Sequence, residues 1–338
     1  MTIPAKPFEI FCGTGGVGKT TLATSRAIYL ASTGLRVLLI TIDPAKRLKD
    51  LLNLRDEDTG EVKTVQFENT TLDALLMSSQ HTIKRMAKLN HSEALEQNSI
   101  IKTLTKPYGG MNEILSLIEV QIQSEKNIYD SIILDTPPGH HFLDFLSGAS
   151  RINHFFDQSF IDIFDYVTNK NAPKRFSLIN KVISSGVNKL LEYLHKVTGA
   201  EFLNNFIEAI RIIYDSKDAF MKGLSLQEKF KQENLSNWFL VTSIEQGKIA
   251  EALDIKHHAK GYFHEGHYLL LNKCLEDELA AWTPQNDTHL RYQQKALLKE
   301  RELKHSMSEL FENVLYFPDI ADVSPLKHIS ELIKNWNK

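Results

Sequence analysis

Residues Gly13 to Thr21 have the sequence GTGGVGKTT, and they restrict the fold of this chain more than any other stretch. They match the pattern G-x-x-x-x-G-K-[ST] at every fixed position. The preceding run, Phe8 to Cys12, is apolar and typical of a buried strand, whereas Leu22 to Leu30 has helical apolar spacing. A strand, a glycine-rich loop and a helix in this order predict a phosphate-binding loop, because backbone N–H groups and the helix dipole both favour anions.

Two later apolar runs each lead to an aspartate. Arg36 to Ile42 is a predicted strand that ends before Asp43, and Ser131 to Leu134 is another that ends before Asp135. In an open α/β sheet, ligands bind beyond the carboxyl ends of the strands. We therefore expect both aspartates to face the ligand of the glycine-rich loop.

The loop and these aspartates suggest a site for a nucleoside triphosphate and Mg²⁺. We expect Lys19 to bridge the outer phosphates, and the Thr20 hydroxyl and the Asp135 carboxylate to hold Mg²⁺, an ion that prefers oxygen ligands and keeps several waters. The predicted phosphate contacts are Gly13, Thr14, Gly15, Gly16, Val17, Gly18, Lys19, Thr20 and Thr21.

Three more predicted strands, Trp238 to Thr242, Tyr268 to Asn272 and Val314 to Pro318, extend the sheet. Asn272 and Lys273 resemble the start of a guanine-reading N-K-x-D box, but Leu275 occupies the position of the aspartate. An amide can satisfy the donor and acceptor edge of adenine. The sequence therefore favours ATP over GTP, with Asn272 at the base.

The predicted fold is α/β, a doubly wound and mostly parallel sheet of the P-loop NTPase type with a helical insertion. We assign 1–149 and 236–338 to the ATPase core and 150–235 to the insertion, where helical apolar spacing replaces strand patterns. Within the core, Val62 to Phe67 is a candidate edge strand, and Leu72 to Asn90 has a helix-like apolar series.

Composition limits the setting of the protein. The 338 residues carry a formal net charge of −3, which gives no bulk attraction to nucleic acid or to anionic membranes. No run approaches the roughly 20 apolar residues needed to span a bilayer. With two cysteines and no apolar N-terminal segment, we expect a cytoplasmic protein with at most peripheral membrane association and no nucleic-acid partner.

Three segments together resemble the signature segments of the ArsA-type ATPases, namely GTGGVGKTT, IDPAKRLKDLL and ILDTPPGHHFLDFL. That family includes arsenite-pump ATPases and ATPases that deliver tail-anchored membrane proteins. The resemblance implies Mg²⁺-dependent ATP hydrolysis by a dimer, with Asp43 positioning the attacking water and Pro318 bordering the adenine. It also implies a helical insertion after the Asp135 turn that handles a protein client, although the same apolar faces fit a helical lid.

Thr14 departs from the family pattern G-K-G-G-x-G-K-T, whose first lysine contacts nucleotide across the dimer. A hydroxyl cannot replace that charge, and one cation in trans changes rates by roughly 10³–10⁵ in other nucleotide hydrolases. The chain is therefore expected to be slow alone, and a partner could restore the charge. The expected dimer is a homodimer or a heterodimer with a lysine-bearing paralogue. Cys12 and Cys274 are too few for a zinc-bridged dimer or a cysteine arsenite site.

Other interpretations stay open. The chain could be a positioning ATPase similar to MinD and ParA that acts on membrane or DNA, or a degenerate nucleotide-binding subunit. The amphipathic run Pro325 to Trp336 fits a membrane tail less well than docking on the sheet. His140 and His141 could contact a partner subunit or simply be solvated.

Overall fold

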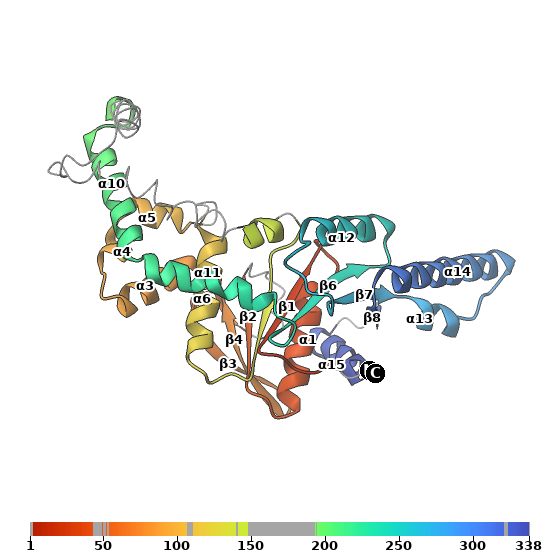
Figure 1. Ribbon diagram of the computed structural model, residues 1–338. Helices are drawn as coiled ribbons and strands as arrows, with labels where there is room; N and C mark the ends of the chain where they lie inside the picture. The colour runs from red at the N-terminus through yellow and green to blue at the C-terminus, as the bar shows by residue number, and fades with distance from the viewer. Residues whose placement is uncertain are drawn as a thin grey trace. The chain divides into compact units, whose positions relative to one another are not determined.

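The computed structural model describes residues 3–42, 49, 52, 54–106, 111–139, 141–147, 193, 195–320 and 324–337. In this part of the chain one eight-stranded sheet has the order β3-β4-β2-β5-β1-β6-β7-β8 (Figure 1). The strands are β1 (Phe8–Gly13), β2 (Val37–Thr41), β3 (Val62–Phe67), β4 (Thr70–Leu76), β5 (Ser131–Asp135), β6 (Ser236–Ser243), β7 (Tyr268–Cys274) and β8 (Asn313–Pro318).

All strand pairs are parallel except β3 with β4. Strands β1, β2, β5 and β6 are buried along their whole length, as expected for a sheet covered on both faces. From β1 the chain builds one side with β2 to β5 and the other with β6 to β8. The prediction of a mostly parallel α/β sheet is confirmed, and the strand order changes direction at β1, where ligands bind in such folds.

The helices lie between the strands in the sequence, and α1, α12 and α14 contact strands of the sheet. The longer ones are α1 (Lys19–Ser32), α3 (Ser79–Leu89), α6 (Asn112–Glu125), α10 (Ala200–Asp215), α11 (Lys217–Phe230), α12 (Gln246–His258), α14 (Asp287–Leu310) and α15 (Pro325–Ile333). The shorter ones are α4 (Ala94–Gln97), α5 (Ser99–Leu104), α13 (Glu276–Ala281) and the 3₁₀ turns η1 (Asp56–Asp58) and η2 (Lys334–Asn337). No helix among the described residues is both long and apolar enough to cross a membrane.

The helix predicted over Leu72 to Asn90 is wrong in its first part. Thr70–Leu76 is strand β4, and helix α3 begins only at Ser79. Strand β4 lies between β3 and β2, and its last three residues are all buried. Buried apolar residues follow one another in such a strand, so their spacing does not distinguish it from a buried helix.

The chain divides into two compact units. The first contains Met1–Ser78, Val120–Leu146 and Leu226–Lys338 and carries the sheet. The second contains Ser79–Glu119 and Ser147–Ser225, which include α3 to α5 and α10. Within it, α10 packs on α4 and α5, and the Asn98 side chain donates to the Asn205 carbonyl oxygen at 3.2 Å. Much of the predicted insertion, 150–235, lies outside the described residues, and its boundaries stay a prediction.

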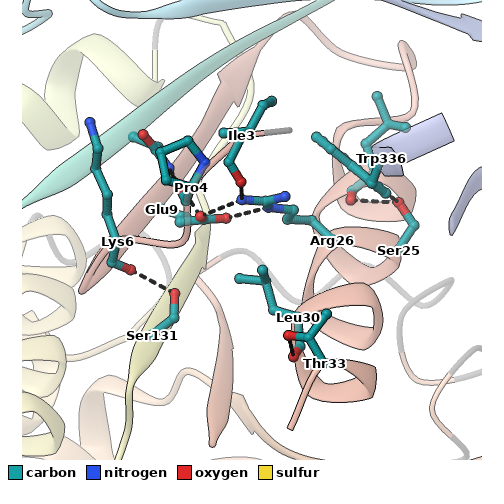
Figure 2. A network of polar contacts seen from close by, with 12 residues as sticks. Ile3, Pro4, Lys6, Glu9, Ser25, Arg26, Leu30, Thr33, Ser131 and Trp336 are labelled. Atoms are coloured by element: carbon teal, nitrogen blue, oxygen red, sulfur yellow. Dashed lines mark hydrogen bonds and ion pairs between the residues drawn. The ribbon is translucent and has the colours of Figure 1, made fainter. Parts of the chain in front are cut away.

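A buried ion pair joins the first strand to the helix of the glycine-rich loop (Figure 2). The Arg26 guanidinium on α1 donates to both carboxylate oxygens of Glu9 on β1, at 2.8 and 2.9 Å, and both side chains are fully buried. Arg26 also donates to the Ile3 carbonyl oxygen at 3.1 Å, and Asn237 on β6 donates to Glu9 at 3.0 Å. The network therefore fixes α1 relative to two central strands and the N-terminal segment.

The C-terminal segment packs on α1 within the same unit. Ile329, Leu332 and Trp336 are 0%, 0% and 1% exposed. The Trp336 indole donates to the Ser25 hydroxyl on α1 at 2.9 Å, and its ring lies 5.2 Å from the Arg26 guanidinium (Figure 2). The amphipathic run at the C-terminus is thus docked in this fold, and these three side chains belong to the core, whereas Leu326 at its start is 55% exposed.

Candidate functional site

The glycine-rich loop connects β1 to α1 at the carboxyl edge of the sheet. Gly13 and Gly18 have φ of 150° and 90°, in the region that favours glycine. A Cβ at Gly13 would overlap the Val241 carbonyl of the neighbouring strand β6, and a Cβ at Gly18 would overlap the side-chain amide of Asn272. Both positions require glycine because the backbone is turned into the left-handed region against a close neighbour.

This loop presents a row of backbone donors. Helix α1 begins at Lys19, and its N-cap, Gly18, provides no side-chain cap. The first backbone bond of α1 runs from the Leu22 N–H to the Gly18 carbonyl oxygen at 2.9 Å, so the N–H groups of Lys19, Thr20 and Thr21 have no acceptor within the helix. The first turn of a helix always leaves such donors unsatisfied, and together with the dipole they favour an anion. The arrangement fits phosphate oxygens.

Lys19, Thr20 and Asp135 come together beside these donors. The Thr20 hydroxyl donates to Oδ2 of Asp135 at 2.7 Å, and the Lys19 ammonium lies 3.9 Å from Oδ1. Lys19 and Asp135 are only 8% and 2% exposed. A buried carboxylate, a hydroxyl and an ammonium at the edge of the loop provide the charges and oxygen atoms that a phosphate–metal pair needs.

These groups fit Mg²⁺ bound mainly through phosphate oxygens and water. In the described part of the chain, no group of three or more His, Cys, Asp or Glu side chains is positioned for a metal. One carboxylate and one hydroxyl are instead the small protein contribution that Mg²⁺ typically receives at nucleotide sites. Thr20 and Asp135 are the residues that would hold it.

The turn after β5 is tied to the loop. The Thr136 hydroxyl and backbone N–H both donate to the Phe11 carbonyl oxygen, at 2.8 and 3.2 Å. The Gly139 N–H donates to the Gly13 carbonyl oxygen at 3.0 Å. Movement of this turn therefore acts on the backbone at the start of the glycine-rich loop.

Asn272 lies against the loop from the end of β7. Its amide nitrogen donates to the Val17 carbonyl oxygen at 2.8 Å. The next residue, Lys273, donates from its ammonium to the Gly16 carbonyl oxygen at 3.0 Å. The contact of Asn272 with the base stays a prediction. A contact between Lys273 and the loop was not predicted from the sequence. The only available signal for Lys273 was its place next to Asn272.

Pro318 lies at the end of β8, paired with Cys274. It lines a cavity of about 420 Å³ along β8, with Cys274, Glu276 and Lys304 among its other walls. The described residues of this cavity include none from the glycine-rich loop. The assignment of Pro318 to the adenine border stays a prediction.

The structure describes only some of the remaining predicted residues. Asp43 and His140 lie outside the described residues, whereas His141 is exposed in the helix at 141–147. Thr14 is 1% exposed, and its hydroxyl has no hydrogen-bond partner among the described residues. A buried polar atom of this kind is costly unless a ligand or water satisfies it.

Both cysteines are buried and unpaired. The thiol of Cys12 on β1 donates to the Phe239 carbonyl oxygen, and burial raises its pKa far above the ordinary range. Burial also raises the pKa of Cys274 to about 12. Thiols held protonated in this way are poor nucleophiles and poor metal ligands.

Comparison with known proteins identifies relatives over nearly the whole chain. A family model described as anion-transporting ATPase matches residues 7–335. An ATPase get3 of Botryotinia fuckeliana is 26% identical over 325 residues, covering 95% of this chain and 87% of that protein. A putative arsenical pump-driving ATPase 2 of Aquifex aeolicus is 26% identical over 322 residues, covering 93% and 90%. The ATPase ARSA2 of Chlamydomonas reinhardtii is 36% identical over 137 residues, covering 40% and 36%.

Proposed function

The chain belongs to the anion-transporting ATPase family, and from this membership and the loop geometry we propose that it hydrolyses Mg-ATP as a dimeric, nucleotide-controlled switch. The family match and the ATPase relatives establish a nucleotide-binding ATPase of the ArsA type. The magnesium, the dimer and a protein client are the proposed parts.

The observation that carries the proposal is the meeting of Lys19, Thr20 and Asp135 beside the free loop donors. Thr20 and Asp135 are 115 positions apart, yet their side chains are hydrogen-bonded at 2.7 Å. The loop N–H groups would bind the phosphate oxygens, and the Lys19 ammonium would stabilise charge on the outer phosphates. Bound Mg²⁺ would supply further neutralisation of phosphoryl charge. Asp43, by the family resemblance, would orient the attacking water.

Titration calorimetry and a phosphate-release assay test this proposal. We expect the wild-type chain to bind Mg-ATP, Lys19→Ala to lose most of the affinity, and Asp135→Asn to lose most of the magnesium dependence. Lys231→Ala is a matched control, because it removes a surface ion pair with Glu228 on α11. A folded wild-type sample that gives no heat with adenine nucleotides, or a Lys19→Ala chain with unchanged affinity, would overturn it.

Thr14 leads us to propose that the active dimer obtains its missing cation from a partner. Since one cation in trans is worth roughly 10³–10⁵ in rate elsewhere, the lone chain should be slow. A paralogue with lysine at this position should restore hydrolysis, and Thr14→Lys should raise the lone-chain rate by on the order of 10³. A lone wild-type chain that already hydrolyses ATP at the rate of the Thr14→Lys variant would instead favour a self-sufficient homodimer.

We further propose that the second unit receives a protein client with an apolar segment. Tyr193, Val197 and Phe202 fall within ten consecutive positions of the chain and are 61%, 62% and 41% exposed, and a patch of exposed apolar side chains would mark an interaction surface. A fluorescent peptide with one apolar helix of about 20 residues is a suitable probe. Its binding should depend on nucleotide and fall in a Val197→Ser, Phe202→Ser chain. Unchanged binding in that chain would favour the lid interpretation.

The alternatives make different predictions. A membrane-positioning ATPase needs an available tail, but Ile329, Leu332 and Trp336 are buried in the core. Vesicle co-sedimentation with ATP, with and without residues 325–338, distinguishes the two functions. A degenerate subunit would keep its cellular role in a Lys19→Ala chain that no longer binds nucleotide. We place the protein in the cytoplasm because its two cysteines are unpaired.

A further inference from the structure

Two consecutive side chains at the end of β7 contact two consecutive carbonyls of the glycine-rich loop. Asn272 donates to the Val17 carbonyl oxygen at 2.8 Å, and Lys273 donates to the Gly16 carbonyl oxygen at 3.0 Å. Strand β7 is separated from β1, which leads into the loop, by β6. The contacts therefore join the loop to a strand that is not its neighbour in the sheet.

The backbone at this point is adapted to make both contacts. Consecutive residues of a regular strand point to opposite faces, so they cannot both reach one loop. Lys273 has φ of 58°, in the left-handed region, and the pairing of β7 with β8 is irregular between Leu271 and Cys274. A non-glycine residue in this conformation costs conformational energy, and such strain is typical of functional positions.

The two contacts orient the donors of the loop. In a planar trans peptide, the C=O and the following N–H point in opposite directions. Holding the carbonyls of Gly16 and Val17 toward β7 turns the N–H groups of Val17 and Gly18 away from it. Both N–H groups come before the first helical bond of α1, which the Leu22 N–H makes to the Gly18 carbonyl oxygen. The β7 side chains thus fix the anion-binding orientation before any ligand arrives.

Lys273 also brings a positive charge to the loop. Its side chain is half-buried, and among the described residues no carboxylate lies within 4.0 Å of its ammonium. By contrast, Lys304 in the same unit lies 2.8 Å from two glutamates, Glu276 and Glu300. The charge of Lys273 is therefore available to an anion beside the loop, on a chain whose Thr14 is neutral.

We propose that Lys273, with Asn272, is a positioning residue that preorganises the loop for the phosphates of the nucleotide, an inference that rests on the proposed function. The pair holds the carbonyls of Gly16 and Val17 toward β7, and the Lys273 ammonium adds electrostatic attraction for a polyphosphate. Because Lys273 would stabilise the bound substrate and the transition state equally, removing its side chain should raise KM and change kcat little.

The test compares Mg-ATP binding and hydrolysis in a small set of variants. Lys273→Met removes the charge and the donor but keeps a long side chain. Lys273→Asn suits the left-handed backbone, so this variant should fold, yet it is too short to reach Gly16. Both should weaken Mg-ATP binding about tenfold, which is 1.4 kcal/mol, with kcat at saturating ATP nearly unchanged. Lys273→Arg should restore most of the affinity.

Lys256→Met is the matched control. Lys256 also donates from its ammonium to a backbone carbonyl, that of Leu310, at 2.9 Å in the same unit. This variant should lose stability through the same kind of bond without losing nucleotide affinity. Adenosine binding should be unaffected in every variant, because the effect acts through the phosphates.

The outcomes distinguish a failure of this inference from a failure of the proposed function. If the wild type binds Mg-ATP and Lys273→Met and Lys273→Asn bind it as tightly, the inference is overturned and the proposed function stands. Loss of affinity that Lys273→Arg does not restore also overturns it, because a mere packing defect would then explain the loss. If the wild type binds no nucleotide, the proposed function fails, and this inference fails with it.

Discussion

Arg26→Met should be one of the most destabilising substitutions in the first unit. It leaves the Glu9 carboxylate fully buried, with the Asn237 amide at 3.0 Å as its remaining donor among the contacts described above. Removing one partner of a buried ion pair costs about 3–5 kcal/mol, because the other charge is left uncompensated. The variant also loses the guanidinium contact with the Trp336 ring at 5.2 Å. Against a total stability of about 5–15 kcal/mol, this is a large fraction.

Urea unfolding followed by tryptophan fluorescence measures this loss. Trp238, Trp282 and Trp336 are the three tryptophans, and all belong to the first unit, so their emission reports on that unit. With a slope of about 3 kcal/mol per molar urea, the midpoint should fall by roughly 1–1.7 M.

Two companion variants make the reasoning refutable. In Glu9→Gln, Arg26→Met the buried charge is gone, so much of the lost stability should return. Arg36→Met breaks an exposed pair with Asp130 and should shift the midpoint far less. A double variant as unstable as Arg26→Met, or an Arg26→Met midpoint no lower than that of Arg36→Met, would show that the buried charge does not control stability.

Three smaller effects concern the buried thiols, the exposed Arg36–Asp130 pair and Gly18. Burial raises the pKa of both thiols, that of Cys274 to about 12, so each thiol stays protonated in the folded protein. The raised pKa values contribute to folding stability below the unfolded pKa of about 8.5, and this contribution is lost as the pH rises above it. A disulfide reagent at pH 8 should therefore label Cys12 and Cys274 only after unfolding, and rapid labelling of the native protein would contradict this. The hydrogen bonds from Arg36 lower the pKa of Asp130 to about 2. Asp130→Asn should therefore lower Tm slightly at pH 7, and the difference from wild type should shrink as the pH falls from about 4 to 2; a constant difference would be inconsistent with it. Gly18→Ala should cost about 1–3 kcal/mol from positive φ and from overlap with the neighbouring amide, and should weaken Mg-ATP binding, which calorimetry would detect.

Sequence patterns predicted most strands and helix α1, because burial imposes a period on apolar residues. The pattern failed at β4, where burial of successive residues removes that period. The expected meeting of Asp43 and Asp135 at the carboxyl edge came from a general rule of parallel sheets, and not from local pattern.

The sequence by itself determined the glycine-rich loop and the flanking strand and helix, because these follow from residue types within about 20 consecutive positions. Only the tertiary structure decided which side chains meet that loop. Asn272, which contacts the Val17 carbonyl, lies 255 positions from Val17 in the sequence. The buried pair of Arg26 and Glu9 is contacted by Trp336, from the other end of the chain. The order and register of the strands fix such contacts, and local patterns do not encode them, since pairing depends on the whole sheet.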